Sequence, residues 1–591
     1  MDISSLNKLT YYYITLLICK IFCHLKKFLP SLNPSEDSLG YRKAKHLLRR
    51  ACFSYSKNTL DLFATLTAED AVHELSNEPI LFWEHPYDPV VNSESGVPDG
   101  FWMHTENTTP QDFTVGHFRK KAIISGWWWY NAQKQNSLKH KLIFFLHSCF
   151  TLSKHDGVPK SSYFYDYLRL LDFYAYDLKT LAKKITFDNS ILYYLDNNTN
   201  NKNNPNENYA REFLELFTIL KGEQIGEGNY TTYTESDIQN AAKVFSGIKT
   251  KPLRDTLDPD TQIPMGYVNT GQHDTADKIF SSAFDNQIIS GQSTEQGVIQ
   301  EVDDFVEMIF SQQATAKSYC RKLYRFYVKS EWNQEVEDDI ISPLADLLIA
   351  NNFNLIPVLE TLLVSQHFYD EDTINNSDEI IGSIVKSPIQ LISETINLLD
   401  ISLLNPEASA YNPPSTFSEE QLNFKRFYYN FAYLSFFTST ALRPFSPETV
   451  AGYPAMYQSP SFDRNWFTSN TIIGRYKLIE CFITGQNKIN NSGTNIRAYF
   501  DSVEYVENSG NFSLANNAST LVTEIADLLY CESIDSTRVT YFVSILTDGL
   551  EEYYWSSAWT DYLQTGNQVQ VKTRLDSLFT GMLNAAEFQL M

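Results

Sequence analysis

Apolar residues along most of the chain recur every three to four positions, which is the spacing of one face of an α-helix. Strand-like alternation is short and falls mostly within residues 252–294, where Gly, Pro, Asn and Asp interrupt the chain. Two polar stretches, residues 370–377 and 485–517, are predicted to be loops. The pattern predicts helices over residues 40–51, 139–150, 163–195, 206–221, 236–246, 300–310, 314–328, 340–363, 387–399, 417–438, 466–482, 518–529, 536–547 and 569–588.

These elements place the chain in the mainly α class, as a large multi-helix body with a few short strands or hairpins in long loops. The body could divide into two lobes near residue 375. We expect an amphipathic N-terminal extension over residues 1–35, a helical lobe over residues 36–375 and a second helical lobe over residues 376–591 packed on the first. No period of 20–50 residues recurs, so a solenoid of stacked repeats is not expected.

The N-terminal extension has an amphipathic pattern of its own. Between Ile14 and Leu29 the apolar residues share one helix face, and basic residues occupy the other. Lys20 interrupts the apolar run that a signal peptide needs, no small-residue cleavage site follows, and the stretch is too short to span a membrane. Three interpretations are open. The stretch is a helix that docks on the rest of the protein or the product of a start codon placed too far upstream, it is a helix on a membrane surface, or it is an atypical export signal.

The composition supports a folded core and argues against nucleic acid as a partner. Of the 591 residues, 43% are hydrophobic and 14% are aromatic, which supplies enough apolar surface to order the chain. The formal net charge of −24 would repel a phosphate backbone. The seven cysteines lack the paired spacing of disulfide frameworks or zinc sites, so we expect most of them to be buried thiols.

The predicted helix over residues 206–221 is apolar on one face and strongly charged on the other. Glu207, Arg211 and Glu215 recur at i, i+4 and i+8, so one arginine lies between two carboxylates. Glu212 and Glu215 could converge on one point and divide the roles of general acid and general base. The alternative is a half-buried ion network that fixes this helix against its neighbours.

An asparagine-rich loop precedes this helix and has the spacing of a calcium-binding loop. Position 6 of residues 196–207 is Asn201 instead of glycine, Pro205 interrupts the loop, and asparagine also recurs in loops because it tolerates left-handed turns. Calcium is therefore a candidate cofactor, and the spacing alone does not assign a calcium site to this loop. Positions 1, 3, 5, 9 and 12, which would supply the ligands, are Asp196, Asn198, Asn200, Asn204 and Glu207.

Two further groups could contribute to a site. His273 and Asp274 are adjacent in a predicted loop, where the carboxylate could orient the imidazole as a base. Asn206, Tyr209 and Trp466 are candidate contacts to a partner or ligand, and an aromatic ring could stack on a sugar, which makes a glycan a candidate ligand. The sequence has no nucleophile elbow, HExxH motif, P-loop or dinucleotide-binding glycine motif.

A series of motifs runs through the chain in a fixed order: LGYRKAKHLLRRACFSYS, FFLHSCF, LYYLDNNTNNKNNPNENYAREFLELFTI, YTESDIQNAAKVFSGI, HDTADKIF, YCRKLYRFYV, IVKSPIQLI and PFSPETVAGYP with NWFTSNTIIGRY. In this order they resemble the successive blocks of the bacterial domain-of-unknown-function family 1800, over roughly residues 38–480. The closing AAEFQLM is similar to the end of Bacteroidota members.

The resemblance carries family positions onto named residues and also has departures. Asn204 stands where the family has a histidine, and the family's HNHF is His147-Ser148-Cys149-Phe150 here, which weakens any metal site built from those histidines. The matching positions are Asn206, Glu207, Tyr209, Arg211, Glu212 and Glu215, followed by Lys386, Pro388, Pro447, Gly452 and Trp466.

The resemblance implies a helical protein of the cell envelope or an exported one, although no clear signal peptide is present, and it implies no established activity. It also implies a partner from domain-of-unknown-function family 1501, which is similar to alkaline phosphatases and sulfatases. Two function classes stay open. The first, favoured because no recognised catalytic constellation is present, is a binding or accessory protein for such a partner or for a glycan. The second is a hydrolase or sugar-active enzyme that uses Glu207, Arg211, Glu212, Glu215, His273 and Asp274.

Overall fold

The computed structural model describes residues 30–76, 117–155, 157–372, 379–403, 424–457 and 462–591. In these residues the chain is mainly α-helical, as its apolar spacing predicts. None of the helices in this described part is long and apolar enough to cross a membrane. The N-terminal amphipathic helix predicted before Leu29 lies outside the described residues.

The described N-terminal part is helical, and one of its predicted helices is broken into shorter ones. Residues 163–195, predicted as one helix, form three, because Asp177 and Asp188 each cap a new helix by accepting a hydrogen bond from a backbone N–H three residues on, at 3.0 Å in both cases. The elements are η2 (Pro30–Leu32), α2 (Gly40–Ala51), α3 (Lys57–Phe63), α4 (Ala68–Ser76), α6 (His117–Lys134), α7 (Leu138–Cys149), α8 (Ser161–Phe173), α9 (Leu178–Ile185) and α10 (Asn189–Tyr194).

The middle of the chain combines helices with three small antiparallel sheets, each formed by two strands. The predicted helix over residues 340–363 is interrupted where Asn354 caps a new one. The helical elements are η4 (Asn197–Thr199), α11 (Asn208–Glu212), the π-helical η5 (Phe213–Phe217), α12 (Glu235–Val244), η6 (Ser282–Phe284), α13 (Glu295–Phe310), α14 (Gln313–Tyr327), α15 (Gln334–Val336), the π-helical η7 (Glu337–Ile341), α16 (Ser342–Ala350), α17 (Leu355–Val364) and η8 (His367–Tyr369).

One strand pair lies within the stretch that the sequence marks for strands, one straddles its start, and the pair nearest the N-terminus lies well before it. They are β1 (Gln224–Gly226) with β2 (Asn229–Tyr230), β3 (Ile248–Lys249) with β4 (Tyr267–Val268), and β5 (Lys278–Ile279) with β6 (Ile288–Ile289).

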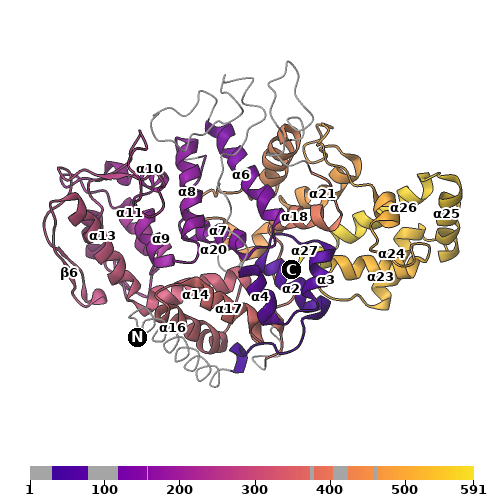
Figure 1. Ribbon diagram of the computed structural model, residues 1–591, viewed down its shortest axis with the longest axis horizontal. Coiled ribbons are helices and arrows are strands. Elements are labelled where there is room, and N and C mark those ends of the chain that lie inside the picture. Colours follow the sequence, from indigo (N-terminus) through magenta and orange to yellow (C-terminus); the bar gives the residue numbers. More distant parts are fainter. Residues whose placement is uncertain (1–29, 77–116, 156, 373–378, 404–423, 458–461) are drawn as a thin grey trace, which may run out of the picture.

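The C-terminal part is helical throughout its described residues. Its elements are α18 (Pro388–Leu398), the π-helical η9 (Phe424–Phe437), α20 (Pro454–Tyr457), η10 (Phe462–Trp466), α21 (Ile472–Thr484), α22 (Ser502–Asn508), α23 (Ala518–Leu529), α24 (Ser536–Thr547), α25 (Glu552–Thr565), α26 (Val569–Asn584) and α27 (Ala586–Gln589). Figure 1 shows an elongated body, with α11 and α13 toward one end, α23–α26 at the other, and α7 and α20 between them.

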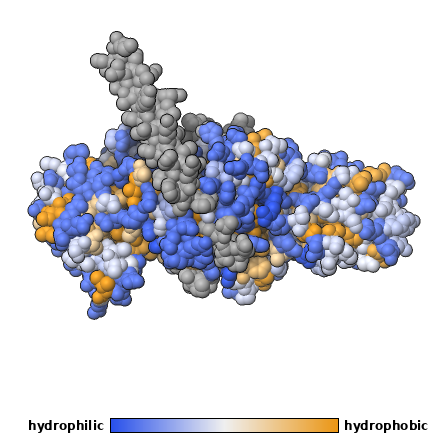
Figure 2. Space-filling model, turned by 90° about the horizontal axis from the view of Figure 1, so that it is seen from below, coloured by the Kyte–Doolittle hydropathy of each residue, from blue (hydrophilic) through white to orange (hydrophobic). Residues whose placement is uncertain are grey.

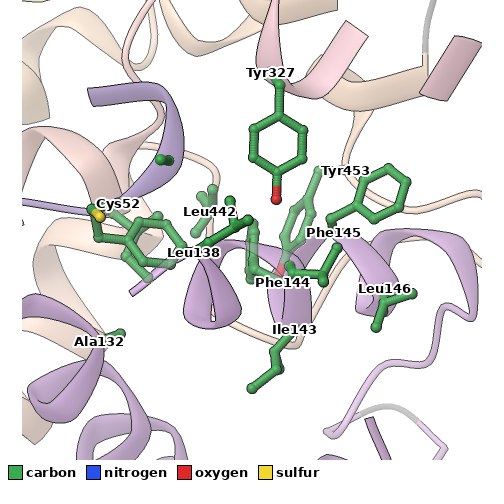
Figure 3. Packing of buried hydrophobic residues seen from close by; sticks show 14 of the residues in the cluster. Cys52, Ala132, Leu138, Ile143, Phe144, Phe145, Leu146, Tyr327, Leu442 and Tyr453 are labelled. Atoms are coloured by element: carbon green, nitrogen blue, oxygen red, sulfur yellow. The ribbon is translucent and has the colours of Figure 1, made fainter. Parts of the chain in front are cut away.

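The helix α7 forms the centre of the core and is buried along almost all of its length. Its aromatic side chains contact distant parts of the chain, as the close view in Figure 3 shows. The ring of Phe144 stacks on that of Tyr453 with centroids 5.8 Å apart, and Phe145 meets Phe326 edge-on at 5.5 Å. Segments on both sides of the predicted lobe boundary therefore share one core around α7.

A buried ion cluster joins α2, near the start of the described residues, to α18 and to the end of α23. The Glu394 carboxylate on α18 lies 2.7 Å from the Arg49 guanidinium on α2 and 3.1 Å from the Lys386 ammonium, and all three side chains are fully buried. Arg49 also donates to the carbonyl oxygen of Leu529 at 2.6 Å. Although burial opposes ionisation, the charges of Arg49 and Lys386 hold the pKa of Glu394 below its usual value.

The predicted boundary between lobes, at residues 375 and 376, falls in residues 373–378, which lie outside the described part of the chain. The helix α2 of the first predicted lobe contacts residues of the second at several points, including the Lys45 ammonium, which donates to the carbonyl oxygens of Asp527 and Tyr530 at 2.8 and 2.7 Å. The division into two lobes stays a prediction.

We expect Glu394→Gln to destabilise the fold strongly, because it leaves two buried cations without their carboxylate. Breaking a buried ion pair from one side costs about 3–5 kcal/mol. The midpoint of denaturant unfolding, followed by circular dichroism, measures the loss. Glu532→Gln is the matched control, since Glu532 pairs with Arg42 of the same helix at 2.6 Å but both side chains are about half exposed. That change should cost at most about 1 kcal/mol, and equal losses in the two variants would contradict the assignment.

Candidate functional site

The ion network that the spacing of the central helix predicts is formed, and it extends beyond the helix. Arg211 is held by Glu235 at 2.6 Å, by Glu207 at 3.2 Å and by Glu215 at 3.4 Å, and Lys221 pairs with Glu215 at 2.8 Å. The Arg211 side chain is 34% exposed. The network is therefore open to solvent, and the contact to Glu235 at the start of α12 could not be inferred from helix spacing.

Glu212 lies apart from this network. No hydrogen bond or ion pair of its side chain is formed with the described residues. Burial, together with the nearby charge of Glu215, raises the pKa of Glu212 to about 6. A carboxyl group in this state can give up or accept a proton near neutral pH.

His273 is fully buried, and its imidazole is held on both sides. Its Nδ1 lies 2.7 Å from the carbonyl oxygen of Ser246, and its Nε2 lies 3.1 Å from a Glu301 carboxylate oxygen. Lys278 donates to the other oxygen of Glu301 at 2.5 Å. The Asp274 carboxylate instead accepts from a backbone N–H two residues on, at 2.9 Å. The structure does not pair Asp274 with the His273 ring, so the predicted dyad is not formed.

The candidate catalytic residues are divided between the two ends of α12. Arg211 contacts Glu235, the first residue of this ten-residue helix, whereas His273 contacts Ser246, just beyond its end. Ten helical residues span about 15 Å. His273 therefore cannot act on the same bond as the glutamates of the central helix without a rearrangement.

The asparagine-rich loop caps the end of α12. Asn197 donates from Nδ2 to the carbonyl oxygen of Phe245 at 3.1 Å, and Asn200 donates to that of Ala242 at 2.8 Å. Asn206 holds the loop through its own Nδ2, which donates to Asp196 and Thr199 oxygens at 3.2 and 3.0 Å. These amides satisfy helix carbonyls that have no partner within the helix, which explains why the loop is rich in asparagine.

Several oxygens of the predicted calcium loop accept hydrogen bonds from protein donors. The side-chain oxygen of Asn198 accepts from the backbone N–H and the hydroxyl of Thr250 at 3.0 and 2.9 Å. The Lys249 ammonium donates to the carbonyl oxygens of Asn198 and Asn200 at 2.7 and 2.9 Å. A protein cation thus lies against loop oxygens, and among the described residues no cluster of three or more His, Cys, Asp or Glu side chains could hold a metal. Calcium at this loop stays a prediction that these contacts do not favour.

Of the three candidate ligand contacts, Trp466 lines the cavity described below, and Asn206 and Tyr209 do not. Tyr209 is fully buried, and its hydroxyl shares a hydrogen bond with Thr186 at 2.9 Å, while Asn206 holds the loop described above. Tyr209 and Asn206 therefore serve the fold.

The cavity that contains Trp466 has a volume of about 360 Å³ and lies at the centre of the molecule. It is formed where α7, α14 and α20 meet, with walls completed by residues 384–387 and 462–466 (Figure 1). Its inner wall is apolar and fully buried, and its rim includes partly exposed residues such as Leu220 and Arg321. Its aromatic and sulfur-containing side chains are Phe53, Phe144, Phe145, Cys149, Phe326, Trp332, Met456, Phe462, Trp466 and Met591.

One face of α14 gives the cavity its charge. Ser318, Arg321, Lys322 and Arg325 recur at i, i+3, i+4 and i+7, so they lie on one side of the helix, and all four line the cavity. Lys141 adds a fourth basic side chain from α7, whereas Asp463 is the only acidic side chain among the lining residues. The cavity is therefore strongly cationic in a chain whose formal net charge is −24.

Arg325 is the cation of this face with the fewest partners. Its Nε is buried and has no hydrogen-bond partner among the described residues, and the same holds for the hydroxyl of Ser318. The guanidinium stacks on the ring of Phe462 at 3.9 Å and faces Trp332 at 5.3 Å. Burial lowers the pKa of Arg325 to about 10, so the group is charged at neutral pH, and no carboxylate of the described residues pairs with it. Arg321, by contrast, has Glu337 at 2.6 Å.

The central helix contributes to this cavity through its C-terminal end. After Glu212 the helix widens into the π-helical η5, and Leu216 and Leu220 line the cavity. The carbonyl oxygen of Leu216 accepts from the Lys322 ammonium at 2.6 Å, and that of Phe217 accepts from the Tyr319 hydroxyl at 2.6 Å. Donors on α14 thus satisfy the helix-end carbonyls.

Local sequence patterns do not reveal this cavity, although the motifs along the chain supply much of its lining. The segments FFLHSCF, YCRKLYRFYV, IVKSPIQLI, PFSPETVAGYP and NWFTSNTIIGRY, which lie far apart in the chain, all contribute lining residues. The signal that could have identified it is the basic face of α14 at helical spacing in an otherwise apolar helix. The convergence of the other segments is a tertiary property and has no local signal.

Comparison with known proteins gives one match. A family described as a protein of unknown function (DUF1800) matches residues 46–590 of the chain. No curated protein and no solved structure matches it.

We expect Arg211→Ala to cost little stability, because the network is partly exposed. Exposed ion pairs contribute about 0.2–1 kcal/mol each, so the three contacts together should give a loss of roughly 1–2 kcal/mol. The midpoint of denaturant unfolding measures it, with Arg42→Ala as the control, since Arg42 is a more exposed arginine that pairs with the single carboxylate of Glu532. A loss of stability as large as that expected for Glu394→Gln would show that the network around Arg211 behaves as a buried ion network.

We expect millimolar calcium to leave the melting temperature of chelator-treated protein unchanged, because the Lys249 ammonium already lies against two loop carbonyl oxygens. Lys249→Met should lower the melting temperature, since leaving buried acceptors unpaired costs about 1–3 kcal/mol. A calcium-dependent rise that Asp196→Ala removes would instead restore the calcium site.

Proposed function

We propose that this chain, which belongs to the DUF1800 family, is a binding protein whose central cavity holds the anionic group of a small molecule with an apolar body. The observation that carries the proposal is the buried, unpaired Nε of Arg325 on the cationic face of α14. As a binding protein the chain falls in the first of the two function classes that the sequence leaves open, and the proposal adds a small molecule as its ligand.

The cavity has the two parts that such a ligand needs. Aromatic walls remove apolar surface from water, which supplies most of the binding free energy without fixing orientation. The guanidinium of Arg325 and the hydroxyl of Ser318 are donors with unused capacity, and they would fix the anionic group. A phosphate, sulfate or carboxylate would take the place of the missing counter-ion.

The ligand class is compatible with the partner that the family resemblance implies. A protein similar to phosphatases and sulfatases would act on phosphate or sulfate esters, which are anions of this kind. We propose that the chain acts beside such a partner as an accessory protein. Exposed apolar side chains at one end of the body, on α24, on α25 and between them, offer anchors for docking, with acidic residues next to them in the sequence. The apolar residues are Tyr541, Leu550, Tyr553 and Tyr554, and the acidic ones are Asp548, Glu551 and Glu552. The face shown in Figure 2 is a mixture of polar and apolar patches.

The alternative is a hydrolase or sugar-active enzyme that uses the paired glutamates of the central helix. The observation in its favour is the pKa of Glu212, raised to about 6 by burial and by Glu215. It ranks second because neither glutamate lines the central cavity and because Glu215 is held by Arg211 and Lys221. Hydrolysis of a generic ester or glycoside that Glu212→Gln abolishes in a folded protein would reverse this order.

We expect Arg325→Met to weaken binding of 8-anilinonaphthalene-1-sulfonate by tenfold or more, because a charged hydrogen bond contributes about 1.5–3 kcal/mol. The measurement is a fluorescence titration of the full chain. The neutral probe N-phenyl-1-naphthylamine has the same apolar body without the sulfonate, and its affinity should change by less than about threefold.

Arg42→Met is the matched control, because it removes the same charge from a residue that does not line the cavity. It should leave both probes unaffected. If Arg325→Met weakens the two probes equally, or if Arg42→Met weakens the sulfonate as much, the proposed anion site is wrong.

A further inference from the structure

The cavity contains one cation that anion binding alone does not account for. Lys141, on α7, is 3% exposed and lines the cavity with its side chain. Its ammonium nitrogen lies 4.8 Å from the centre of the Phe53 ring and 5.9 Å from that of Phe326. Its one hydrogen bond is long, 3.3 Å to the carbonyl oxygen of Arg49, and no carboxylate of the described residues pairs with it.

This environment makes Lys141 a nucleophile. Burial, helped by the charge of Arg50, lowers the pKa of Lys141 to about 7, against the opposing influence of Cys52 and Glu394. A large fraction of the side chain is therefore the neutral amine at neutral pH, whereas an ordinary lysine is almost entirely protonated. A desolvated lysine in an apolar pocket is the usual form of an imine-forming residue.

We propose that Lys141 forms a reversible imine with the carbonyl carbon of an aldehyde or ketone whose anionic group is held by the cations of α14. The inference rests on the proposed function and names the ligand class more narrowly, as an anionic carbonyl compound. The neutral amine adds to the carbonyl carbon, forming a C–N bond, and the resulting carbinolamine loses its oxygen as water. The C=N double bond replaces C=O, and no oxidant or reductant takes part.

Other buried lysines do not share this combination of features. Lys386 is fully buried too, but it pairs with Glu394 at 3.1 Å and does not line the cavity. Lys45 and Lys154 are occupied by close backbone acceptors away from the cavity. Lys322 lines the cavity, but its ammonium donates to the Leu216 carbonyl oxygen at 2.6 Å. Lys322 is therefore the nearest competitor and the internal comparison for any labelling experiment.

The test is reductive trapping in the full chain. The protein is incubated with 4-carboxybenzaldehyde, the imine is reduced with cyanoborohydride, and the modified residue is located by peptide mass spectrometry. We expect one carboxybenzyl group per chain, on Lys141 and not on Lys322, and its loss in Lys141→Arg. Lys141→Met should lose the label too, and it tests the loss in a variant without a charged side chain at this position. The position of the label in the wild-type protein does not depend on whether either variant folds.

Matched probes separate the anion site from the amine. Benzaldehyde, which lacks the carboxylate, should label Lys141 at least tenfold more slowly, and Arg325→Met should slow labelling by 4-carboxybenzaldehyde to a similar degree. The alcohol 4-carboxybenzyl alcohol cannot form an imine, but it should compete with labelling.

The pH profile distinguishes Lys141 from a surface lysine. Because the neutral amine is the reacting form, the labelling rate should rise between about pH 6 and pH 8 and then level off, whereas an ordinary lysine keeps gaining reactivity beyond about pH 9. The charged and titratable groups that face the amine are Arg50, Cys52 and Glu394 behind the wall, and Arg321, Lys322, Arg325 and Asp463 in the cavity.

The outcomes separate the two proposals. If the sulfonate probe binds through Arg325 but no adduct forms on Lys141, the imine is wrong and the anion site stands. If the adduct maps to surface lysines, or its rate continues to rise beyond about pH 9, the inference is likewise overturned. If the charged and the neutral aldehyde label Lys141 equally, and Arg325→Met leaves the affinities of both dyes unchanged, the amine is reactive but the proposed anion site is wrong.

Discussion

The buried Glu394 carboxylate sets the position of much of the molecule. A fully buried carboxylate remains ionised only if cations and hydrogen-bond donors surround it, and here Arg49 and Lys386 come from segments far apart in the sequence. Their positions also shape the cavity. The carbonyl oxygen of Arg49 receives the hydrogen bond of Lys141, and the neighbours of Lys386 in the chain, Val385 and Ser387, line the cavity. The part of the cavity wall formed by Lys141, Val385 and Ser387 therefore depends on the position of the ion cluster.

The cavity itself is built in the opposite way. Glu394 has its counter-ions within the protein, whereas Arg325 and Lys141 have aromatic rings around them and no carboxylate partner in the described part of the chain. Burying a cation without an anion costs stability, and the cost is recovered only when an anion binds. The overall charge of −24 would keep anions at a distance, so a small anion that enters must be held by these few groups at close range.

Local patterns in the sequence predicted the helices well and their arrangement poorly. Periodicity gave the bounds of α2, α23 and α24, because each has a regular apolar face. Periodicity did not reveal that helices end before Asp177, Asp188 and Asn354, since a capping residue leaves the apolar spacing on both sides intact. The spacing of Glu207, Arg211 and Glu215 gave their mutual contacts. Glu235 and the cavity lay beyond any such pattern, because both depend on which distant segments pack together.

The motif on the central helix has a role in this structure that needs no catalysis. Its charged face forms the network around Arg211, which fixes α11 against the start of α12. The asparagines before it cap the other end of α12. The asparagine-rich loop and the central helix thus contact both ends of α12, and this holds the π-helical turn η5 against α14. There the carbonyl oxygen of Leu216 accepts a hydrogen bond from Lys322, and Leu216 lines the cavity. A charged motif that positions a cavity from a distance explains why its glutamates do not line that cavity.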